Sequence, residues 1–173
     1  LAAGWGSRML PATKSLAKPM IPVVDRPSID YLVEDYSNAG IKEFIIVGKQ
    51  HFEQIEEYFD RQLELEKILE SEGKEKYLKA ITKYNQLKFT FVRQGNLGGT
   101  GDALKRVMHL IPADEPIIVS YADVLMYPRT ALPEMLALYQ KYPGTMIPVC
   151  PVPASEVIHY GVAKIKAQIE PKF

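Results

Sequence analysis

The chain has 173 residues, of which 47% are hydrophobic and 24% charged, and its 21 basic and 21 acidic side chains cancel to a formal net charge of +0. This composition is typical of a globular protein whose core needs no cross-link, and the single cysteine, Cys150, excludes a disulfide framework. No stretch reaches the roughly 18 apolar residues of a membrane span, and zero net charge excludes nucleic-acid binding by bulk electrostatics, so we expect a cytoplasmic protein that binds neither membranes nor nucleic acids.

Strands and helices are predicted to alternate along the chain. β-branched and aromatic runs indicate strands, and capped or amphipathic segments indicate helices. We expect Ser28 to cap the first helix and Gly40 to end it. In chain order the elements are the tail of a strand at 1–3, a helix at 28–38, a strand at 44–47, a helix at 52–84 broken at Gly73, a strand at 89–92, a helix at 102–109, a strand at 117–119, a helix at 130–142 and a strand at 145–152.

This alternation predicts an α/β protein with a Rossmann-like, three-layer α/β/α fold and a mainly parallel central sheet. The runs at 44–47 and 117–119 are apolar on both faces, as strands covered by helices on both sides require. Ligands of such sheets bind at the carboxyl ends of the strands. The residues that follow each strand are therefore the candidates for function.

The loop after residues 1–3 combines glycines with cations. Gly4 and Gly6 let backbone N–H groups turn toward an anion, and Arg8 and Lys18 add charges suited to phosphate oxygens. The alternative is a tight turn with surface cations. Met9 replaces the third glycine of G-x-G-x-x-G and no P-loop motif occurs, which argues against a Rossmann dehydrogenase and a P-loop NTPase.

Two further candidates follow later strands. Gln94 lies in a second glycine cluster and carries a donor and an acceptor on one amide, which reading a uracil edge requires; a glutamine in a surface turn is the alternative. Asp123 is a lone carboxylate after the 117–119 run, where it could hold a Mg²⁺ ion whose other ligands are phosphate oxygens and water. An aspartate that only forms a turn is the alternative.

The opening run LAAGWGSRMLPATKSLAKPMIPVVDRP, residues 1–27, closely resembles the signature of the sugar-nucleotide pyrophosphorylases, a nucleotidyltransferase superfamily. Within it, LPATK at 10–14 and Arg93-Gln94-Gly95 are most similar to the bacterial UTP:glucose-1-phosphate uridylyltransferases. The similarity covers nearly the whole chain. We therefore expect residues 1–173 to be a single nucleotidyltransferase domain of the nucleotide-diphospho-sugar transferase type, incomplete at both ends.

The resemblance implies a role for each matching residue. Backbone groups of the first loop would contact base and ribose, the next glycine and arginine would hold the triphosphate, and the following lysine would lie near the attacked phosphate. The glutamine and a glycine of the second cluster would contact base and ribose, and the aspartate would hold Mg²⁺. These residues are Ala2, Ala3 and Gly4, then Gly6 and Arg8, then Lys18, then Gln94 and Gly99, and finally Asp123.

The sugar end and three other positions depart from the family or match it only in part. Tyr160-Gly161-Val162 resembles the family segment whose glycine lies against the hexose, so Gly161 and Glu170 are the candidate sugar contacts. The family's lysine between that glutamate and a proline is missing here. Ala17 stands where the family usually has proline, and Gly98 and Asp102 stand where the uridylyltransferases usually have lysine and histidine.

The activity that the resemblance implies is formation of UDP-glucose and pyrophosphate from UTP and glucose 1-phosphate, by Mg²⁺-assisted in-line attack on the α-phosphate in a self-associating enzyme. Two alternatives stay open because of Gly98, Asp102 and the missing lysine. One is a thymidylyltransferase or another sugar-1-phosphate nucleotidyltransferase. The other is a relative that binds nucleotide sugars without catalysis.

Overall fold

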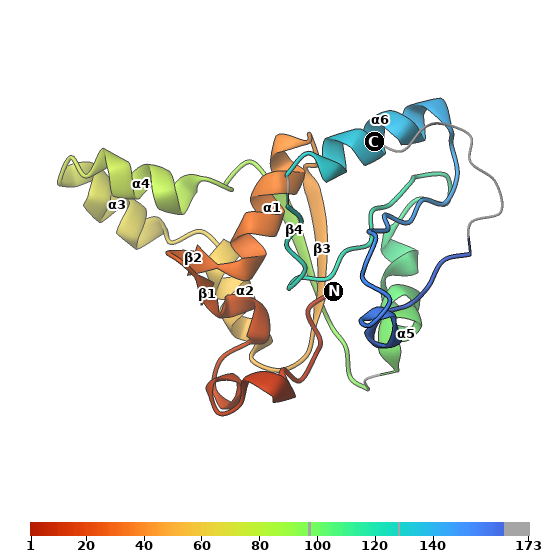
Figure 1. Cartoon of the computed structure of the whole chain (residues 1–173). Helices are drawn as coiled ribbons and strands as arrows, with labels where there is room; N and C mark the ends of the chain where they lie inside the picture. Colours follow the sequence, from red (N-terminus) through yellow and green to blue (C-terminus); the bar gives the residue numbers. More distant parts are fainter. Residues whose placement is uncertain (97, 128, 165–173) are drawn as a thin grey trace. The chain divides into compact units, whose positions relative to one another are not determined.

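The computed structural model describes residues 1–96, 98–127 and 129–164. The chain divides into two compact units, Leu1–Leu132 and Pro133–Phe173, and each is described by itself (Figure 1). The candidate residues up to Asp123 all belong to the first unit. In the described part of the second, the chain continues α6 (Ala131–Lys141) and then forms the 3-10 helix η5 (Val157–His159).

The first unit is built from short 3-10 helices, a small hairpin, two longer strands and the helices around them. Its elements are η1 (Ser7–Met9), η2 (Ala12–Lys14), η3 (Lys18–Met20), β1 (Pro22–Val23), β2 (Arg26–Pro27), α1 (Ser28–Asn38), β3 (Glu43–Gly48), α2 (Phe52–Phe59), α3 (Leu63–Ser71), α4 (Glu75–Thr82), β4 (Lys88–Arg93), α5 (Gly99–Val107) and η4 (Met108–Leu110). β1 and β2 pair antiparallel.

Strands β3 and β4 form the parallel sheet, in register from Glu43 opposite Lys88 to Gly48 opposite Arg93. The start of the chain adds to the free side of β3 at its carboxyl end, where Ala2 forms a parallel bridge with Gly48. Parallel strands joined by helical crossovers are the arrangement that the alternating pattern predicts. The α/β class is therefore confirmed.

The two faces of the sheet bury different cores. Phe44 and Ile46 of β3 pack with α1 and α2 in one cluster. Ile45 and Val47 point to the opposite face and pack with Ala103 and its neighbours on α5 in another. Because successive side chains of a strand point to opposite faces, an uninterrupted apolar run can fill both cores. Helices on both sides give the three-layer arrangement, with strand ends left free for ligands.

Several helix predictions are confirmed and two details are corrected. α1 has the predicted bounds, and Gly40, at φ +95°, follows its last turn. The 52–84 segment breaks at Gly73 as predicted and also at residues 60–62. Ser28 is not the cap: it is the first helical residue, and its hydroxyl donates to the Pro19 carbonyl at 3.0 Å. That bond ties the helix to the loop that carries Lys18.

The strand predictions at 117–119 and 145–152 are wrong: the structure assigns neither run to a strand. A cavity of about 730 Å³ is lined both by β3 and by residues 117–119, and among the described residues no backbone hydrogen bond pairs this run with a strand. The second run contains Pro148 and Pro151, which cannot donate to a ladder. No helix in the described part of the chain is long and apolar enough to cross a membrane.

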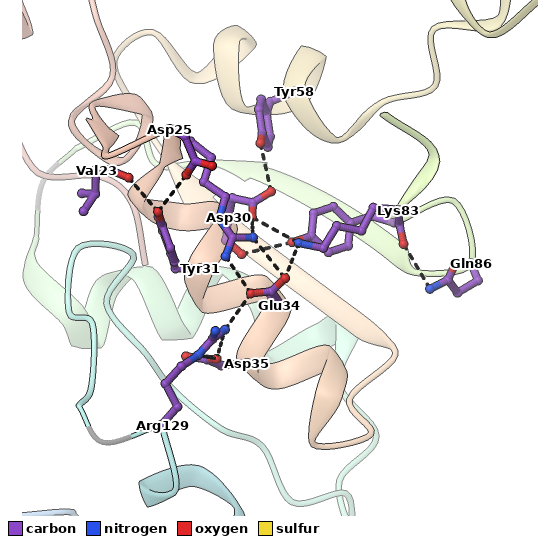
Figure 2. A network of polar contacts seen from close by, with 12 residues as sticks. Val23, Asp25, Asp30, Tyr31, Glu34, Asp35, Tyr58, Lys83, Gln86 and Arg129 are labelled. Atoms are coloured by element: carbon purple, nitrogen blue, oxygen red, sulfur yellow. Dashed lines mark hydrogen bonds and ion pairs between the residues drawn. The ribbon is translucent and has the colours of Figure 1, made fainter. Parts of the chain in front are cut away.

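A network of charged side chains fastens the hairpin and the α3–α4 pair to α1 (Figure 2). Glu34 of α1 is its centre and accepts from Arg26 of β2 at 2.8 Å, from Lys83 after α4 at 2.6 Å and from Arg129 at 2.7 Å. Asp30, one turn earlier, is buried and accepts from Arg26 and from the Tyr58 hydroxyl. Asp35 is also paired with Arg129, so three cations face three carboxylates and these partly buried charges remain paired.

The hydrogen bond from the Arg26 guanidinium, with further ones from the Lys83 ammonium and the Arg129 guanidinium, holds the pKa of Glu34 well below its ordinary value of 4.5. Burial and the neighbouring Asp30 raise the pKa of Tyr58. A carboxylate whose pKa is lower in the folded than in the unfolded chain stabilises the fold fully above the unfolded value. That contribution is lost as the pH falls through the interval below it.

We predict that Glu34→Gln lowers the free energy of unfolding at pH 7 by about 2 kcal/mol, because Arg26 and Lys83 lose a charged acceptor. The wild-type advantage should shrink as the pH falls below about 4.5, since the Glu34 carboxylate of the unfolded chain then binds a proton while that of the folded chain stays ionised. Urea denaturation at pH 7 and at successively lower pH measures both effects. Glu64→Gln, on an exposed carboxylate of α3, is the matched control, and an equal pH dependence of Glu34→Gln and wild type would contradict the prediction.

Candidate nucleotide site

Gly6 makes the turn on which the first loop depends. Its φ is +64°, and a Cβ there would lie 2.7 Å from Cγ2 of Thr13 and 3.3 Å from Cβ of Lys18. Thr13 is buried and its hydroxyl donates to the Gly6 carbonyl at 2.9 Å. Both the backbone conformation and the close approach therefore require glycine, and together they bring the loop back onto the segment that carries Lys18.

The segment before Lys18 is braced from α2. The Gln54 amide bonds to two backbone groups: Nε2 donates to the Ser15 carbonyl, and Oε1 accepts from the Ala17 N–H, both at 2.9 Å. A proline at position 17 would have no N–H to donate. The alanine that departs from the family pattern is thus used as a hydrogen-bond donor in this chain, and Gln54 is a supporting residue that the sequence pattern did not reveal.

A cavity of about 380 Å³ opens where the chain leaves the carboxyl ends of the strands. It brings together residues from the first loop, the second glycine cluster and the segment before Val124. Its lining consists of Leu1, Ala2, Ala3, Gly4, Gly6, Lys18, Pro19, Gln94, Gly99, Thr100, Ala103, Tyr121 and Asp123. Most of the candidates therefore share one cavity, although they come from three separate parts of the sequence.

Lys18 and Asp123 face each other in this cavity and form an ion pair between Nζ and Oδ2. Their side chains are 34% and 38% exposed, so both charges remain accessible to a ligand. Within the described ranges, no group of three or more His, Cys, Asp and Glu side chains could enclose a metal ion. A single accessible carboxylate fits a Mg²⁺ ion that takes its remaining oxygens from phosphate and water.

Gln94 is nearly inaccessible, at 2% exposure, and its amide is held by α5. Nε2 donates to Oδ2 of Asp102 at 2.8 Å and lies 3.4 Å from the Gly99 carbonyl. Arg106, one turn further along α5, donates to the same carboxylate oxygen at 3.1 Å. The hydrogen bonds from Gln94 and Arg106 lower the pKa of Asp102 and keep it ionised.

Three of the sequence candidates are not brought together in this cavity. Arg8 lies on η1 and does not line it. Gly161 belongs to the second unit, and Glu170 lies outside the described residues. The cavity also includes residues that sequence reasoning missed, among them Tyr121 and Thr100, whose hydroxyls lie 3.0 Å apart. Only their position in the sequence could have indicated them, because each lies within a few residues of a predicted site residue.

A three-layer α/β fold with a glycine loop, a buried amide and an accessible Lys–Asp pair at the strand ends is typical of the nucleotide-binding proteins. Comparison with known proteins gives the family. The nucleotidyl transferase family model matches residues 1–170. The chain belongs to this family.

Curated relatives include the UTP–glucose-1-phosphate uridylyltransferases of two bacteria. That of Streptococcus pneumoniae serotype 4 is 38% identical over 166 residues, which are 93% of this chain and 55% of that protein. That of Staphylococcus epidermidis is 39% identical over 163 residues, again 93% of this chain and 56% of that protein. The chain thus spans little more than half the length of these relatives.

Solved structures agree with the sequence comparison. An apo UDP-glucose pyrophosphorylase has a TM-score of 0.70 and 38% identity, and the match covers 82% of this chain and 53% of that one. A UTP-bound UGPase from Acinetobacter baumannii has a TM-score of 0.72 and 35% identity, with coverage of 82% and 51%. These likenesses place the three-layer fold among the nucleotidyltransferases.

We predict that Gly6→Ala destabilises the chain by about 1–3 kcal/mol, because the new Cβ meets Thr13 and the left-handed backbone disfavours it. Gly4→Ala is the control, since a Cβ there has nothing within 4 Å. Thermal unfolding without ligand compares the two variants. Equal melting temperatures for them would contradict the role given to Gly6.

Proposed function

We propose that this chain carries the nucleotide site of a UTP:glucose-1-phosphate uridylyltransferase, which forms UDP-glucose and pyrophosphate. The observation that carries the proposal is the shared cavity in which the glycine loop, Gln94 and the Lys18–Asp123 pair converge. The names of the relatives support the choice of substrates. A bound UTP in one structural neighbour and UDP-glucose in another agree with it.

The proposed reaction is a displacement at the α-phosphorus of the nucleotide. A phosphate oxygen of glucose 1-phosphate forms the new bond to this phosphorus, the bond between the α-phosphorus and the oxygen that bridges it to the β-phosphorus breaks, and pyrophosphate leaves with that electron pair. The nucleophile is already an anion, so no covalent enzyme intermediate is needed. The protein's task is to align the two phosphates and to neutralise their charge.

Each nucleotide-side residue predicted from the sequence has a role in this proposal. Backbone groups of Ala2, Ala3 and Gly4 contact base and ribose, as do Gln94 and Gly99. Gly6 and Arg8 hold the triphosphate. Arg8 lies outside the cavity lining, so in this proposal it reaches the phosphates that extend beyond the cavity. Lys18 neutralises the phosphate under attack.

Asp123 is the residue that would hold Mg²⁺. A bound Mg²⁺ neutralises charge on the phosphate oxygens. Lys18 is paired with this carboxylate through Oδ2, so Asp123 holds the Lys18 ammonium at the place in the cavity where the phosphates would lie.

The sugar side of the proposal rests on residues beyond this cavity. Gly161 and Glu170 stay the predicted hexose contacts, and residues 1–173 stay a predicted nucleotidyltransferase domain. Self-association and a cytoplasmic location likewise stay predictions from the sequence. Transfer from dTTP, and nucleotide binding without catalysis, are the two rivals that the departures at Gly98 and Asp102 motivate.

We predict that the complete protein releases pyrophosphate from UTP and glucose 1-phosphate in the presence of Mg²⁺, and that Asp123→Asn reduces this release at least 100-fold while its circular dichroism is unchanged. Asp114→Asn, an exposed carboxylate of the same loop region, should behave as wild type. The assay compares the four common nucleoside triphosphates. A preference for dTTP favours transfer from dTTP. No pyrophosphate release by the complete protein with any of the four favours nucleotide binding without catalysis. Full activity of Asp123→Asn would contradict the role of Asp123 in the site.

A further inference from the structure

The amide of Gln94 is oriented by groups that can only accept its hydrogens. The nearest atom of Asp102 is a carboxylate oxygen, 2.8 Å from the amide, and the Gly99 carbonyl lies on the same side at 3.4 Å. An ionised carboxylate and a backbone carbonyl have no hydrogen to donate. The amide atom beside them must therefore be the nitrogen.

Arg106 fixes the polarity of this arrangement from the other end. Its guanidinium donates to the same Asp102 oxygen, and a guanidinium has no acceptor. Arg106 and Gln94 are therefore both donors, and Asp102 accepts a hydrogen bond from each of them. With both amide hydrogens directed at Asp102 and Gly99, Oε1 is the atom of Gln94 that remains for a ligand in the cavity.

We propose that Asp102 is a positioning residue for base selection: it holds the Gln94 amide so that the side chain presents an acceptor, and so selects a pyrimidine that carries an N–H at ring position 3. Uracil and thymine have this donor. Cytosine has a lone pair there, which would meet Oε1 acceptor to acceptor. The inference rests on the proposed function, in which Gln94 contacts the base, and adds how the choice against cytosine is made.

Gly98 makes room for this arrangement. A Cβ on Gly98 would lie 2.7 Å from Cβ and 3.0 Å from Cγ of Asp102. The backbone at Gly98, with φ −82° and ψ 16°, would accept alanine without strain, so the close approach is the only structural reason for glycine. The two departures from the family pattern therefore act together. The missing side chain at position 98 leaves room for the Asp102 side chain, whose carboxylate reaches Gln94.

The test is the ratio of UTP affinity to CTP affinity, measured by titration calorimetry on the complete protein. Wild type should bind UTP more tightly. Asp102→Leu removes the acceptor, after which Arg106 attracts Oε1 and the amide turns its NH₂ toward the base. The ratio should then fall about 10-fold or more, since one hydrogen bond is exchanged for a mismatch. A loss of affinity for both nucleotides alike, at an unchanged ratio, indicates a merely structural role and overturns the inference.

Asp102→Asn keeps an acceptor that Arg106 still orients, so it should retain most of the wild-type ratio. Gly98→Ala keeps the carboxylate of Asp102 but pushes it away from Gln94, because the new Cβ would meet the Asp102 side chain. It should therefore lower the ratio of UTP affinity to CTP affinity as Asp102→Leu does. Lys105→Ala, an exposed neighbour on the same helix, should leave both affinities unchanged. A Gly98→Ala ratio equal to that of wild type would also overturn the inference.

These outcomes separate the inference from the function beneath it. If wild type does not bind UTP, the proposed function fails. If wild type binds CTP as tightly as UTP, the proposed function stands and the selection against cytosine fails. If wild type prefers UTP and Asp102→Leu keeps the same preference, the proposed function stands and the role of Asp102 fails. Because dTTP carries the same N–H, its affinity relative to UTP should be unaffected by Asp102→Leu.

Discussion

The pairing of the first residues with two separate segments is the constraint on which the rest of the site depends. Ala2 donates to the Val47 carbonyl at 2.7 Å at the end of β3, while the Leu1 carbonyl accepts from Ala122 at 3.0 Å on its other side. The Leu1 nitrogen also donates to the Ser120 carbonyl at 2.6 Å. Backbone bonds on both sides fix the exit of the glycine loop beside the exit of the Asp123 segment. Lys18 and Asp123, 105 positions apart, meet for this reason.

Electrostatics then give the cavity its character. Backbone groups of the glycine loop supply partial positive charge, Lys18 supplies a full one, and Asp123 is the one carboxylate among the described residues of the lining. Such a surface attracts a polyanion and leaves one place for a divalent cation. The neutral net charge of the chain hides this asymmetry, because the acidic side chains of α2 and α3 lie elsewhere. The neutrality of the whole chain therefore gives no measure of how this cavity attracts nucleotides.

The elements that sequence reasoning placed correctly are those determined by local pattern. β3, β4 and α1 have apolar periodicities that packing does not override, and the glycine loop, Gln94 and Asp123 were visible because each follows a strand. The prediction of a strand at 117–119 was wrong because a strand needs a hydrogen-bonded neighbour, and apolar composition cannot show whether one is present. Gln54 was missed for a related reason, since its partners, Ser15 and Ala17, lie 39 and 37 residues away.

The departures from the family pattern have a physical meaning that only contacts could supply. In sequence, Ala17, Gly98 and Asp102 are separate weaknesses in the resemblance. In structure each has a partner: the Ala17 N–H bonds to Gln54, and Gly98 lies against the Asp102 side chain that holds Gln94. A substitution that damages a site leaves buried polar groups without partners. In the described part of the chain, every side-chain nitrogen or oxygen atom that is itself fully buried has a hydrogen-bond partner. The residues at these altered positions therefore have partners in the folded chain. This favours a chain that still binds a nucleotide over one that has lost its nucleotide site.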